Sequence, residues 1–467
     1  MLSQQEIERL VADVLQQMQS EDTTKACPKK CFYEDMNECI EAAAAAQKQL
    51  AKMGMETRKV LIAAMRKAAI DHAEELAKLA YEETGYGSVA HKTAKHILAA
   101  EKTPGPEDLE VKAITGDEGL TLVFPAPFGV IGSIAPSTNP VATVINNSIS
   151  MISGGNTVVF SPHPAAKKCS AKAIEILNEA LISAGSPGPL LFAAKEPTLE
   201  TSNIMLNHPI IRLLSVTGGE GIVKTAMKTG KKVIGAGPGN PPVIVDETAN
   251  IEQAGKDIVD GCSFENNVPC IAEKECFVVE SVGNQLVAAM VKAGAQLIDP
   301  KETEQLLNTV LINKEGKWVI NKKFVGHSAS YLLEKAGIPI KIEDPKCIVT
   351  ITTRDHPFVQ TEMMMPVMAV VYVKDVDEAI ACAVQAEHGC HHSAHMHSMN
   401  VKSLSKAEAA LDTTIFVKNA PSYAGIGFGG EGYTTFTIAT PTGEGLTSAK
   451  SFVRTRRCTL RGAFNML

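Results

Sequence analysis

The chain has 467 residues, of which 45% are hydrophobic and 21% are charged. This composition is that of a globular protein, and the length is enough for two domains of ordinary size. The formal net charge of −7 argues against a basic surface of the kind that binds nucleic acid.

The remaining bulk features favour a cytoplasmic protein. No apolar stretch reaches the roughly 18 residues that a membrane-spanning helix needs, so we expect no membrane association. Glu6, Glu8 and Asp13 interrupt the N-terminus, which does not resemble a secretory signal. The 11 cysteines are odd in number and scattered, which is typical of free thiols in a reducing compartment.

The first predicted element is a short amphipathic helix at residues 2–18, within an N-terminal unit of residues 1–20. Ser3 followed by Glu6 is a capping-box pattern. The apolar residues recur at three- and four-residue steps and form one stripe: Ile7, Leu10, Val11, Val14, Leu15 and Met18. Residues 21–35 form a polar linker, so this helix is expected to dock either on the body of the protein or on a partner.

From residue 36 onward, helical and strand patterns alternate. Residues 36–103 are helical in pattern, and the following segments alternate between strands (128–136, 156–160, 211–215, 232–234) and helices (143–152, 165–184). Such alternation predicts a parallel sheet covered on both faces. We therefore expect an α/β domain over 36–240, a second one over 241–430, and an extended C-terminal segment over 431–467.

Cys270 is the first candidate for chemistry. It follows Pro269 in a polar turn that leads into the strand-like segment Cys276–Val279. A nucleophilic cysteine needs access and a lowered pKa, which a helix N-terminus or nearby donors supply. By itself, however, one cysteine among 11 is more often a buried, inert thiol.

A set of motifs in fixed order resembles the CoA-acylating aldehyde dehydrogenases, in the branch that serves bacterial microcompartments for ethanolamine, propanediol and related substrates. The motifs span essentially the whole chain: APSTNP at 135–140, GNTVVF at 155–160, TGG at 217–219, GAGPGNPP at 235–242, NNVPCIAEKE at 266–275, FGGEGY at 428–433 and TPTGEG at 440–445. The resemblance implies the aldehyde dehydrogenase fold, with a Rossmann-like cofactor domain that binds NAD and CoA, an α/β catalytic domain and an oligomerisation hairpin. That hairpin would combine 106–123 with 431–463 and would join the protein into dimers or tetramers.

The resemblance also implies a reaction. The Cys270 thiolate would attack a short aliphatic aldehyde, from acetaldehyde to butyraldehyde, while the Asn139 amide and the Cys270 backbone N–H stabilise the oxyanion. Hydride transfer to NAD⁺ would leave a thioester on Cys270, which coenzyme A would release as acyl-CoA.

Gly235 marks a departure from the hydrolytic aldehyde dehydrogenases. These enzymes carry a water-activating glutamate in a Glu-Leu-Gly-Gly-Lys stretch, and the aligned position here is Gly235. Without that base, water should attack slowly, and we expect the glycine to leave open volume near the thioester. The alternative function is that of a hydrolytic enzyme, which releases the free acid. The alternative role of Gly235 itself is that of a glycine required only by a turn of the backbone.

The resemblance implies cofactor contacts in the loops after the predicted strands and at two later positions. These residues are Pro136, Ser137, Thr138, Ser161, His163, Pro164, Thr217, Gly218, Gly219, Gly237, Glu362 and His392. Glu362 aligns with the glutamate that binds the nicotinamide ribose. The glycines at 235, 237 and 239 lack the Gly-x-Gly-x-x-Gly spacing of a dinucleotide fingerprint. The lack of an arginine-like partner for a 2′-phosphate beside His163 and Pro164 favours NAD over NADP.

Residues 388–397 contain five histidines and a cysteine, which is also a zinc-binding composition. No second ligand cluster accompanies them, so we expect no metal. Relatives have similar runs here, and we expect a strand whose alternate residues face a cleft, with His392 touching CoA or the cofactor.

The N-terminal helix extends the resemblance, because the related enzymes carry encapsulation peptides. Residues 2–18 are therefore expected to bind a shell protein or other cargo of a bacterial microcompartment in the cytoplasm. A non-catalytic shell or scaffold protein would account for this helix alone. Such a protein would have no need of Asn139 paired with Cys270.

Overall fold

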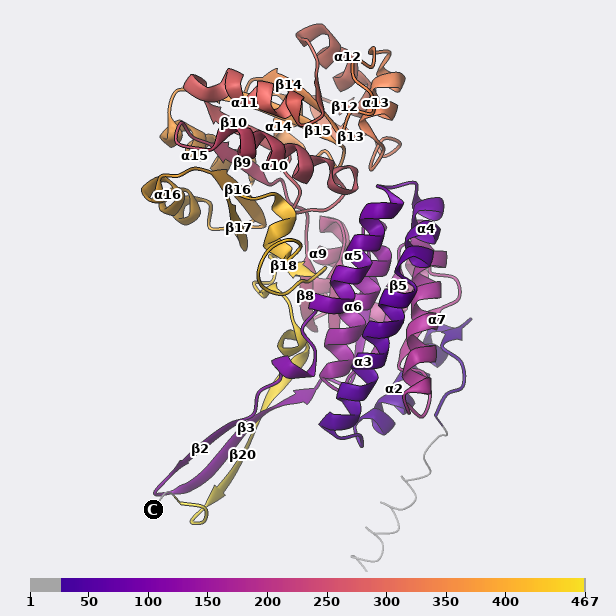
Figure 1. The fold of residues 1–467 in the computed structure, drawn as a ribbon. Coiled ribbons are helices and arrows are strands. Elements are labelled where there is room, and N and C mark those ends of the chain that lie inside the picture. The colour runs from indigo at the N-terminus through magenta and orange to yellow at the C-terminus, as the bar shows by residue number, and fades with distance from the viewer. Residues whose placement is uncertain (1–26, 466–467) are drawn as a thin grey trace, which may run out of the picture.

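The computed structural model describes residues 27–465, and the predicted helix at residues 2–18 lies outside this range. The described chain forms two α/β units stacked end to end, with an antiparallel arm that projects from the first unit (Figure 1). This architecture confirms the predicted α/β class. No helix in residues 27–465 combines the length and the apolar character that crossing a membrane requires.

Helices open the first unit, as predicted for residues 36–103: α2 (Met36–Leu50), α3 (Met55–Asp71), α4 (Ala73–Thr84) and α5 (Val89–Lys102). The Asp35 side chain caps α2 by accepting from the backbone N–H groups of Asn37 and Glu38. Gly85, in a left-handed conformation with φ 69°, ends α4. Gly85 thus turns the chain into the short loop between α4 and α5, and this loop faces the second unit.

The sheet of the first unit is entirely parallel. Its spatial order is β1 (Phe32–Tyr33), β6 (Leu191–Ala194), β5 (Thr157–Pro162), β4 (Val130–Ala135), β7 (Ile211–Thr217) and β8 (Lys232–Ala236). The helices between these strands are α6 (Pro140–Ser153), α7 (Lys167–Ser183), α8 (Leu199–Asn207) and α9 (Glu220–Met227). The chain builds outward from β4 to β6 and then reverses direction through β7, and such a reversal is where doubly wound sheets bind nucleotides.

The second unit is built on a seven-stranded parallel sheet. Its order is β11 (Ala295–Leu297), β14 (Cys347–Thr352), β15 (Val367–Val373), β10 (Glu275–Val279), β9 (Pro242–Val245), β16 (Ser393–His397) and β17 (Ile415–Lys418). The helices are α10 (Ile251–Ser263), α11 (Glu280–Lys292), α12 (Pro300–Val310), α13 (Ala329–Ala336), α14 (Pro357–Gln360), α15 (Val376–Ala386) and α16 (Val401–Leu411), and a hairpin joins β12 (Leu311–Lys314) to β13 (Lys317–Ile320).

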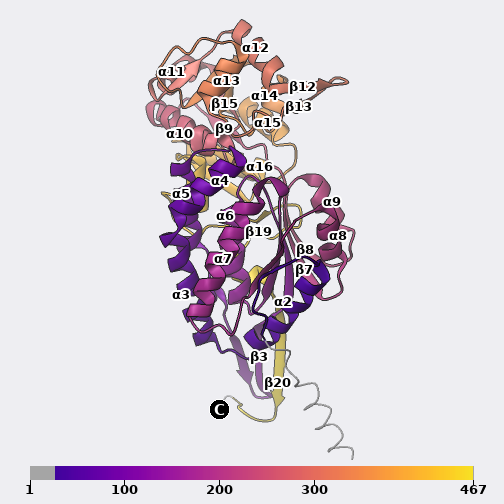
Figure 2. The same cartoon turned by 90° about the vertical axis from the view of Figure 1, so that its right-hand side faces the viewer.

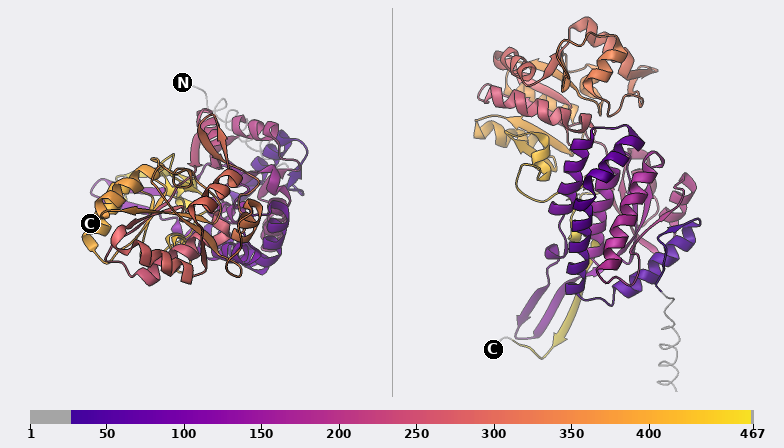
Figure 3. Two further views of the ribbon diagram at one scale, coloured as in Figure 1. Left: turned by 90° about the horizontal axis from the view of Figure 1, so that it is seen from above. Right: turned by 45° about the vertical axis from the view of Figure 1, so that its right-hand side comes forward.

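The projecting arm consists of β2 (Lys112–Gly116), β3 (Gly119–Pro127) and β20 (Val453–Arg461). Figures 2 and 3 show its strands running away from both units. Residues before β20, including β18 (Ile438–Ala439) and β19 (Gly445–Leu446), do not enter the arm. They return to the first unit, where the Asn156 amide donates to the Phe452 carbonyl at 2.9 Å.

The two units meet at opposite ends of their sheets. Because β8 ends at Ala236 and β9 begins at Pro242, the carboxyl edge of the first sheet lies next to the amino edge of the second. The α4–α5 loop contributes direct contacts, since the Gly87 N–H donates to the Gly326 carbonyl at 2.8 Å. The loops that follow the strands of the first sheet and the loops that precede the strands of the second sheet therefore lie together at the boundary between the two units.

Candidate active site

Cys270 lies on this boundary, in a turn with an unusual backbone. Helix α10 ends at Ser263, and Glu265, Asn266 and Asn267 then adopt left-handed conformations with φ of 53°, 52° and 65°. Asparagine tolerates this conformation better than most residues, but three in a row that include a glutamate must be held by their surroundings. The Asn267 amide does so by donating to the carbonyls of Cys262 at 3.0 Å and Glu273 at 2.8 Å.

Lys274 holds the same turn from the other side. Its buried ammonium donates to the Asn267 carbonyl at 2.9 Å, to Asn267 Oδ1 at 2.6 Å and to the Pro269 carbonyl at 3.3 Å. The three contacts fix the backbone immediately before the cysteine. They also bring a positive charge close to the thiol.

Cys270 is half-buried, whereas Cys262 and Cys276 on either side are fully buried. This exposure fits a nucleophile that must meet a substrate. Burial raises the pKa of Cys270 to about 12 and the Glu362 carboxylate adds to the increase, while Lys274 and Lys95 lower it. Of its neighbours, Lys274 and Lys95 are therefore the groups that favour the Cys270 thiolate.

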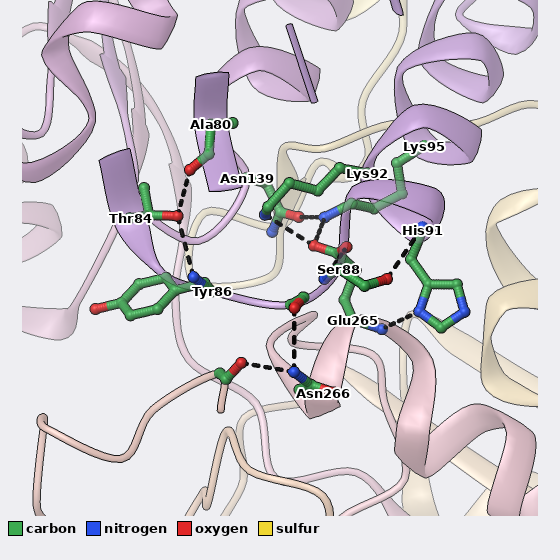
Figure 4. A network of polar contacts seen from close by, with 12 residues as sticks. Ala80, Thr84, Tyr86, Ser88, His91, Lys92, Lys95, Asn139, Glu265 and Asn266 are labelled. Atoms are coloured by element: carbon green, nitrogen blue, oxygen red, sulfur yellow. Dashed lines mark hydrogen bonds and ion pairs between the residues drawn. The ribbon is translucent and has the colours of Figure 1, made fainter. Parts of the chain in front are cut away.

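Asn139 precedes α6 but does not cap the helix with its side chain. Instead, Asn139 Oδ1 accepts a hydrogen bond of 2.6 Å from Lys95 Nζ (Figure 4). A lysine ammonium has only donors, so the contact identifies the carboxamide oxygen and turns the NH₂ group away from Lys95. The Asn139 amide is thus left with hydrogens to donate, as an oxyanion hole requires.

Lys95 belongs to a buried ionic cluster with Lys92 and Glu265. Lys95 and Lys92 lie on α5 and are each 2% exposed, and their ammonium groups lie 2.9 Å and 3.0 Å from the Oε2 atom of the fully buried Glu265 (Figure 4). Burial alone would raise the pKa of Glu265, but Lys95 and Lys92 outweigh it and leave the pKa below its ordinary value.

The sequence analysis missed this cluster, although α5 carries a signal for it. Lys92, Lys95, His96 and Ala99 have the spacing of one helix face, and all four are buried. On an amphipathic helix that face would normally be apolar. Two lysines in such a stripe therefore indicate a buried counterion elsewhere in the chain.

Two more predicted residues gather around Cys270. The Glu362 carboxylate accepts from the Gly239 N–H; burial raises its pKa and Lys274 opposes the rise. The ring of His392, which is 1% exposed, packs against Gly239, where an added Cβ would lie 2.8 Å from the ring and 3.1 Å from the Cys270 carbonyl oxygen. The glycine is therefore needed for His392 to lie this close to the nucleophile loop.

The predicted cofactor loops all lie at the carboxyl edge of the first sheet. Pro136–Thr138 follow β4, Ser161–Pro164 end and follow β5, Thr217–Gly219 end and follow β7, and Gly237 follows β8. The start of α9 suits a pyrophosphate, because Gly219 has no side-chain cap and an added Cβ there would have nothing within 4 Å. Free N–H groups at an open helix start bind phosphate, so the residues present fit a dinucleotide.

Two of these side chains already have partners within the protein. The Ser161 hydroxyl is buried and bonds to the Ser202 hydroxyl at 2.8 Å. His163 Nδ1 accepts from the Ala165 N–H at 3.1 Å. A cofactor that binds at the loop after β5 would therefore contact mainly its backbone N–H and carbonyl groups and not these two side chains.

The expected open volume at Gly235 is wrong. Gly235 lies in β8, where an added Cβ would be 2.8 Å from Val223 Cγ1 and 3.5 Å from Thr442 Cγ2. Its N–H donates to Thr442 Oγ1 at 3.0 Å. Glycine here allows α9 and the returning C-terminal segment to pack tightly against the strand.

The expectation that the histidine-rich strand faces a cleft is also wrong. His395 and His397 on β16 are 0% and 2% exposed, because the strand lies inside the second sheet. Within residues 27–465, no three His, Cys, Asp or Glu side chains converge in a way that would hold a metal ion.

Comparison with known proteins places this geometry in a family. Residues 12–449 match the aldehyde dehydrogenase family. The acetaldehyde dehydrogenase (acetylating) EutE of Escherichia coli is 47% identical, with 100% of both chains covered. The propanal dehydrogenase (CoA-propanoylating) of Salmonella typhimurium is 48% identical, with 99% of each chain covered.

Solved structures agree with this assignment. The Rhodopseudomonas palustris propionaldehyde dehydrogenase, with bound CoA and an acylated cysteine, is 49% identical and superimposes with a TM-score of 0.91, covering 93% of this chain and 99% of that one. A propionaldehyde dehydrogenase from the Clostridium phytofermentans fucose utilisation bacterial microcompartment is 50% identical, with a TM-score of 0.90 and coverage of 92% and 99%. The predicted fold is thereby confirmed, and the chain belongs to the aldehyde dehydrogenase family, in its CoA-acylating branch.

Proposed function

We propose that the protein oxidises a short-chain aliphatic aldehyde, in the acetaldehyde to butyraldehyde range, to its acyl-CoA thioester with NAD⁺. The observation that carries the proposal is a half-buried Cys270 at the boundary of two units, together with an Asn139 amide whose oxygen is held by Lys95, a charge that also acts on Cys270. The relatives support it, because they are named for acetaldehyde and propanal and one solved neighbour holds CoA and an acylated cysteine.

Cys270 and Asn139 have different roles in this reaction. The Cys270 sulfur bonds to the aldehyde carbon, and the Asn139 amide with the Cys270 N–H stabilises the resulting oxyanion. A nicotinamide held by the loops at the carboxyl edge of the first sheet would supply the acceptor for the hydride from that carbon. The collapse of the oxyanion leaves a thioester, which the CoA thiol cleaves while the Cys270 sulfur departs. One aldehyde, NAD⁺ and CoA thus give one acyl-CoA, NADH and a proton, and the exchange of thioesters is reversible.

The chain favours CoA over water as the acyl acceptor. The position of the water-activating glutamate is Gly235, and Val223 and Thr442 fill the space around it. The chain therefore has no carboxylate base at that position. The hydrolytic alternative therefore lacks its main group.

Four loops at the carboxyl edge of the first sheet are proposed to hold the dinucleotide, with Glu362 toward its nicotinamide ribose and His392 toward cofactor or CoA. In domain terms, residues 36–240 would bind NAD and CoA, and residues 241–430 would supply the nucleophile. NAD is proposed over NADP because His163 and Pro164 provide no cation for a 2′-phosphate. An engineered glycolyl-CoA reductase of 48% identity holds NADP⁺, so both cofactors belong in the assay.

The test is NADH formation from propionaldehyde and NAD⁺, with and without coenzyme A, in the wild type and in Cys270→Ala. We expect sustained turnover only with CoA, and none in the variant. Sustained turnover without CoA would mean that water is the acceptor and would refute the acylating assignment. Acetaldehyde, butyraldehyde and NADP⁺, run in parallel, rank the substrates and the cofactors.

We also propose that residues 2–18 bind a shell protein or other cargo of a bacterial microcompartment. The amphipathic stripe in the sequence supports this role, as does the microcompartment origin of the Clostridium phytofermentans enzyme. Residues 1–20 fused to a fluorescent protein should give punctate fluorescence in cells that make such compartments. Diffuse fluorescence in those cells would refute the targeting role.

The arm of β2, β3 and β20 is proposed to join copies of the chain into a dimer or tetramer. Its outer strands β2 and β20 each have one unpaired edge within the described chain. An exposed strand edge is a surface on which another chain can add.

A further inference from the structure

The Asn139 carboxamide has one end that stabilises an oxyanion and one that repels it. The NH₂ group donates hydrogen bonds, whereas the carbonyl oxygen only accepts them. A free carboxamide can present either end toward the nucleophile. Resting on the proposed function, we propose that Lys95 is a positioning residue that holds the Asn139 oxygen and thereby directs the NH₂ group toward the aldehyde bound at Cys270.

The contact geometry supports this role. Lys95 Nζ lies 2.6 Å from Asn139 Oδ1, and within residues 27–465 no other group is bonded to the Asn139 side chain. A flipped carboxamide would place its NH₂ group against the ammonium, donor against donor. Lys95 therefore penalises the unproductive orientation as well as favouring the productive one.

Glu265 keeps Lys95 in place. A buried lysine needs a charged partner, and Glu265 Oε2 lies 2.9 Å from Lys95 Nζ. The carboxylate reaches α5 only because position 87 is glycine, since an added Cβ there would lie 2.7 Å from Glu265 Cδ. Glu265 also begins the left-handed run that leads to Cys270, so one turn carries both the nucleophile and the counterion of Lys95.

The two halves of the catalytic centre come from different units. Asn139 and Lys95 belong to the first unit, and Glu265 and Cys270 belong to the loop that leads into β10 of the second. The ion pair between Lys95 and Glu265 crosses the boundary and therefore fixes the position of the Asn139 donor relative to the Cys270 nucleophile.

Lys92 provides a matched control within the same cluster. It is as buried as Lys95 and bonds to the same carboxylate oxygen at 3.0 Å, yet within the described residues it makes no hydrogen bond to Asn139. Lys92→Met and Lys95→Met each remove one buried ion pair and each leave Glu265 with one lysine. Only Lys95→Met releases the Asn139 oxygen.

The experiment measures the rate constant of the first NADH turnover with propionaldehyde in Lys95→Met, Lys92→Met, Asn139→Ala and the double variant Lys95→Met/Asn139→Ala. Loss of one oxyanion donor in Asn139→Ala should slow this turnover about 10²–10³-fold. Lys95→Met should slow it about 10-fold or more, and Lys92→Met less than about threefold. The double variant should be no slower than Asn139→Ala by more than about twofold, because the two residues act through one amide.

Two further measurements separate the explanations. The rate of Cys270 alkylation by iodoacetamide needs the thiolate but no oxyanion donor, so it should fall much less in Lys95→Met than the rate of NADH formation. Lys95→Gln keeps an N–H donor without the charge and should retain more activity than Lys95→Met. Lys95→Gln also provides the comparison with Lys92→Met if Lys95→Met does not fold, as judged by its thermal midpoint.

Equal losses in the two lysine variants would overturn the inference, as would a double variant whose loss is the product of the single losses. A parallel fall in alkylation and NADH formation would assign Lys95 to the thiol instead and would also overturn it. An unaffected Asn139→Ala would refute the proposed oxyanion role itself. That outcome is distinct from a slow Asn139→Ala with a fully active Lys95→Met, which would refute only the positioning role.

Discussion

At the scale of single residues, buried carboxyl groups surround the nucleophile loop, and Glu273 is the clearest of them. It is fully buried, and its Oε1 atom accepts from the Ser422 N–H at 2.7 Å. Burial raises the pKa of Glu273 to about 7, although Ser422 and Lys274 act against the rise. The folded protein therefore binds this proton more tightly than the unfolded chain does.

The stability of the protein should consequently depend on pH through Glu273. Below its unfolded pKa of about 4.5, Glu273 is protonated in both states, and above pH 7 it is ionised in both. Between these values the unfolded chain alone has lost the proton, so stability falls as pH rises, by up to about 3 kcal/mol. Glu273→Gln, which keeps the acceptor for Ser422, should reduce this loss.

Thermal midpoints of the two proteins measured from pH 4.5 to 7.5 test this prediction. The midpoint difference between variant and wild type should grow in favour of the variant as pH rises. Parallel curves would show that Glu273 titrates at its ordinary pKa. Other buried carboxyls titrate in both proteins, so the difference isolates Glu273.

The residues of the site differ in how far the sequence predicts them. Cys270 and Asn139 were predicted because short motifs in fixed order surround them. Lys95 and Glu265 were not, because their partnership joins residues 170 positions apart and depends on burial that only the assembled fold creates. At Gly235 the prediction was wrong for a different reason. The absence of a side chain suggested open space, but Val223 packs against the glycine and fills that space.

At the scale of elements, periodicity and turn residues predicted β4, β5, β7, β8, α6 and α7 of the first unit, but the prediction did not include β1, β6 or α8. The left-handed run Glu265–Asn267 was not predicted. The two asparagines tolerate such a backbone, but Glu265 gives no sign of it and is held by partners elsewhere in the chain. Helix glycines are similarly ambiguous in sequence. Gly261 in α10 and Gly221 in α9 look alike, but an added Cβ would lie 2.1 Å from the Glu273 carboxylate at the first and would meet nothing within 4 Å at the second.

Alanine substitutions at these two glycines should have opposite effects on stability. Gly221→Ala should raise the free energy of unfolding by about 0.5–1 kcal/mol, because alanine is the better helix former. Gly261→Ala should lower it by about 1–3 kcal/mol, because the buried carboxylate and the Ser422 contact must move. Thermal midpoints relative to wild type measure both, and a stabilising Gly261→Ala would contradict the packing described here.

At the scale of the whole molecule, the arm exposes apolar side chains that a monomer would leave in water. Val111, Ile114, Leu460 and Phe464 are 64%, 47%, 45% and 75% exposed. Ile114 and Leu460 lie on the two outer strands of the arm. Apolar side chains on open strand edges favour association with another chain.

Ile114→Lys combined with Leu460→Lys should therefore split the proposed oligomer. Light scattering after gel filtration should give a multiple of the 49.7 kDa chain mass for the wild type and a value near 49.7 kDa for the double variant. Ile340→Lys, at a side chain 49% exposed on the second unit, controls for the loss of an exposed apolar residue. An unchanged mass in the double variant would rule out these two positions as the contact.

The return of the C-terminal segment to the first unit determines the order in which the protein folds during synthesis. The hydroxyls of Thr121 on β3 and Thr459 on β20 are hydrogen-bonded although the residues are 338 positions apart. Phe452, whose carbonyl accepts from the Asn156 amide, is also synthesised late. The second sheet, contiguous from β9 to β17, can fold before either arrives. The first unit emerges from the ribosome first and is completed last. In a truncated or stalled chain β3 would keep its partner β2 but would lack β20 on its other edge, and an open strand edge is a template for aggregation.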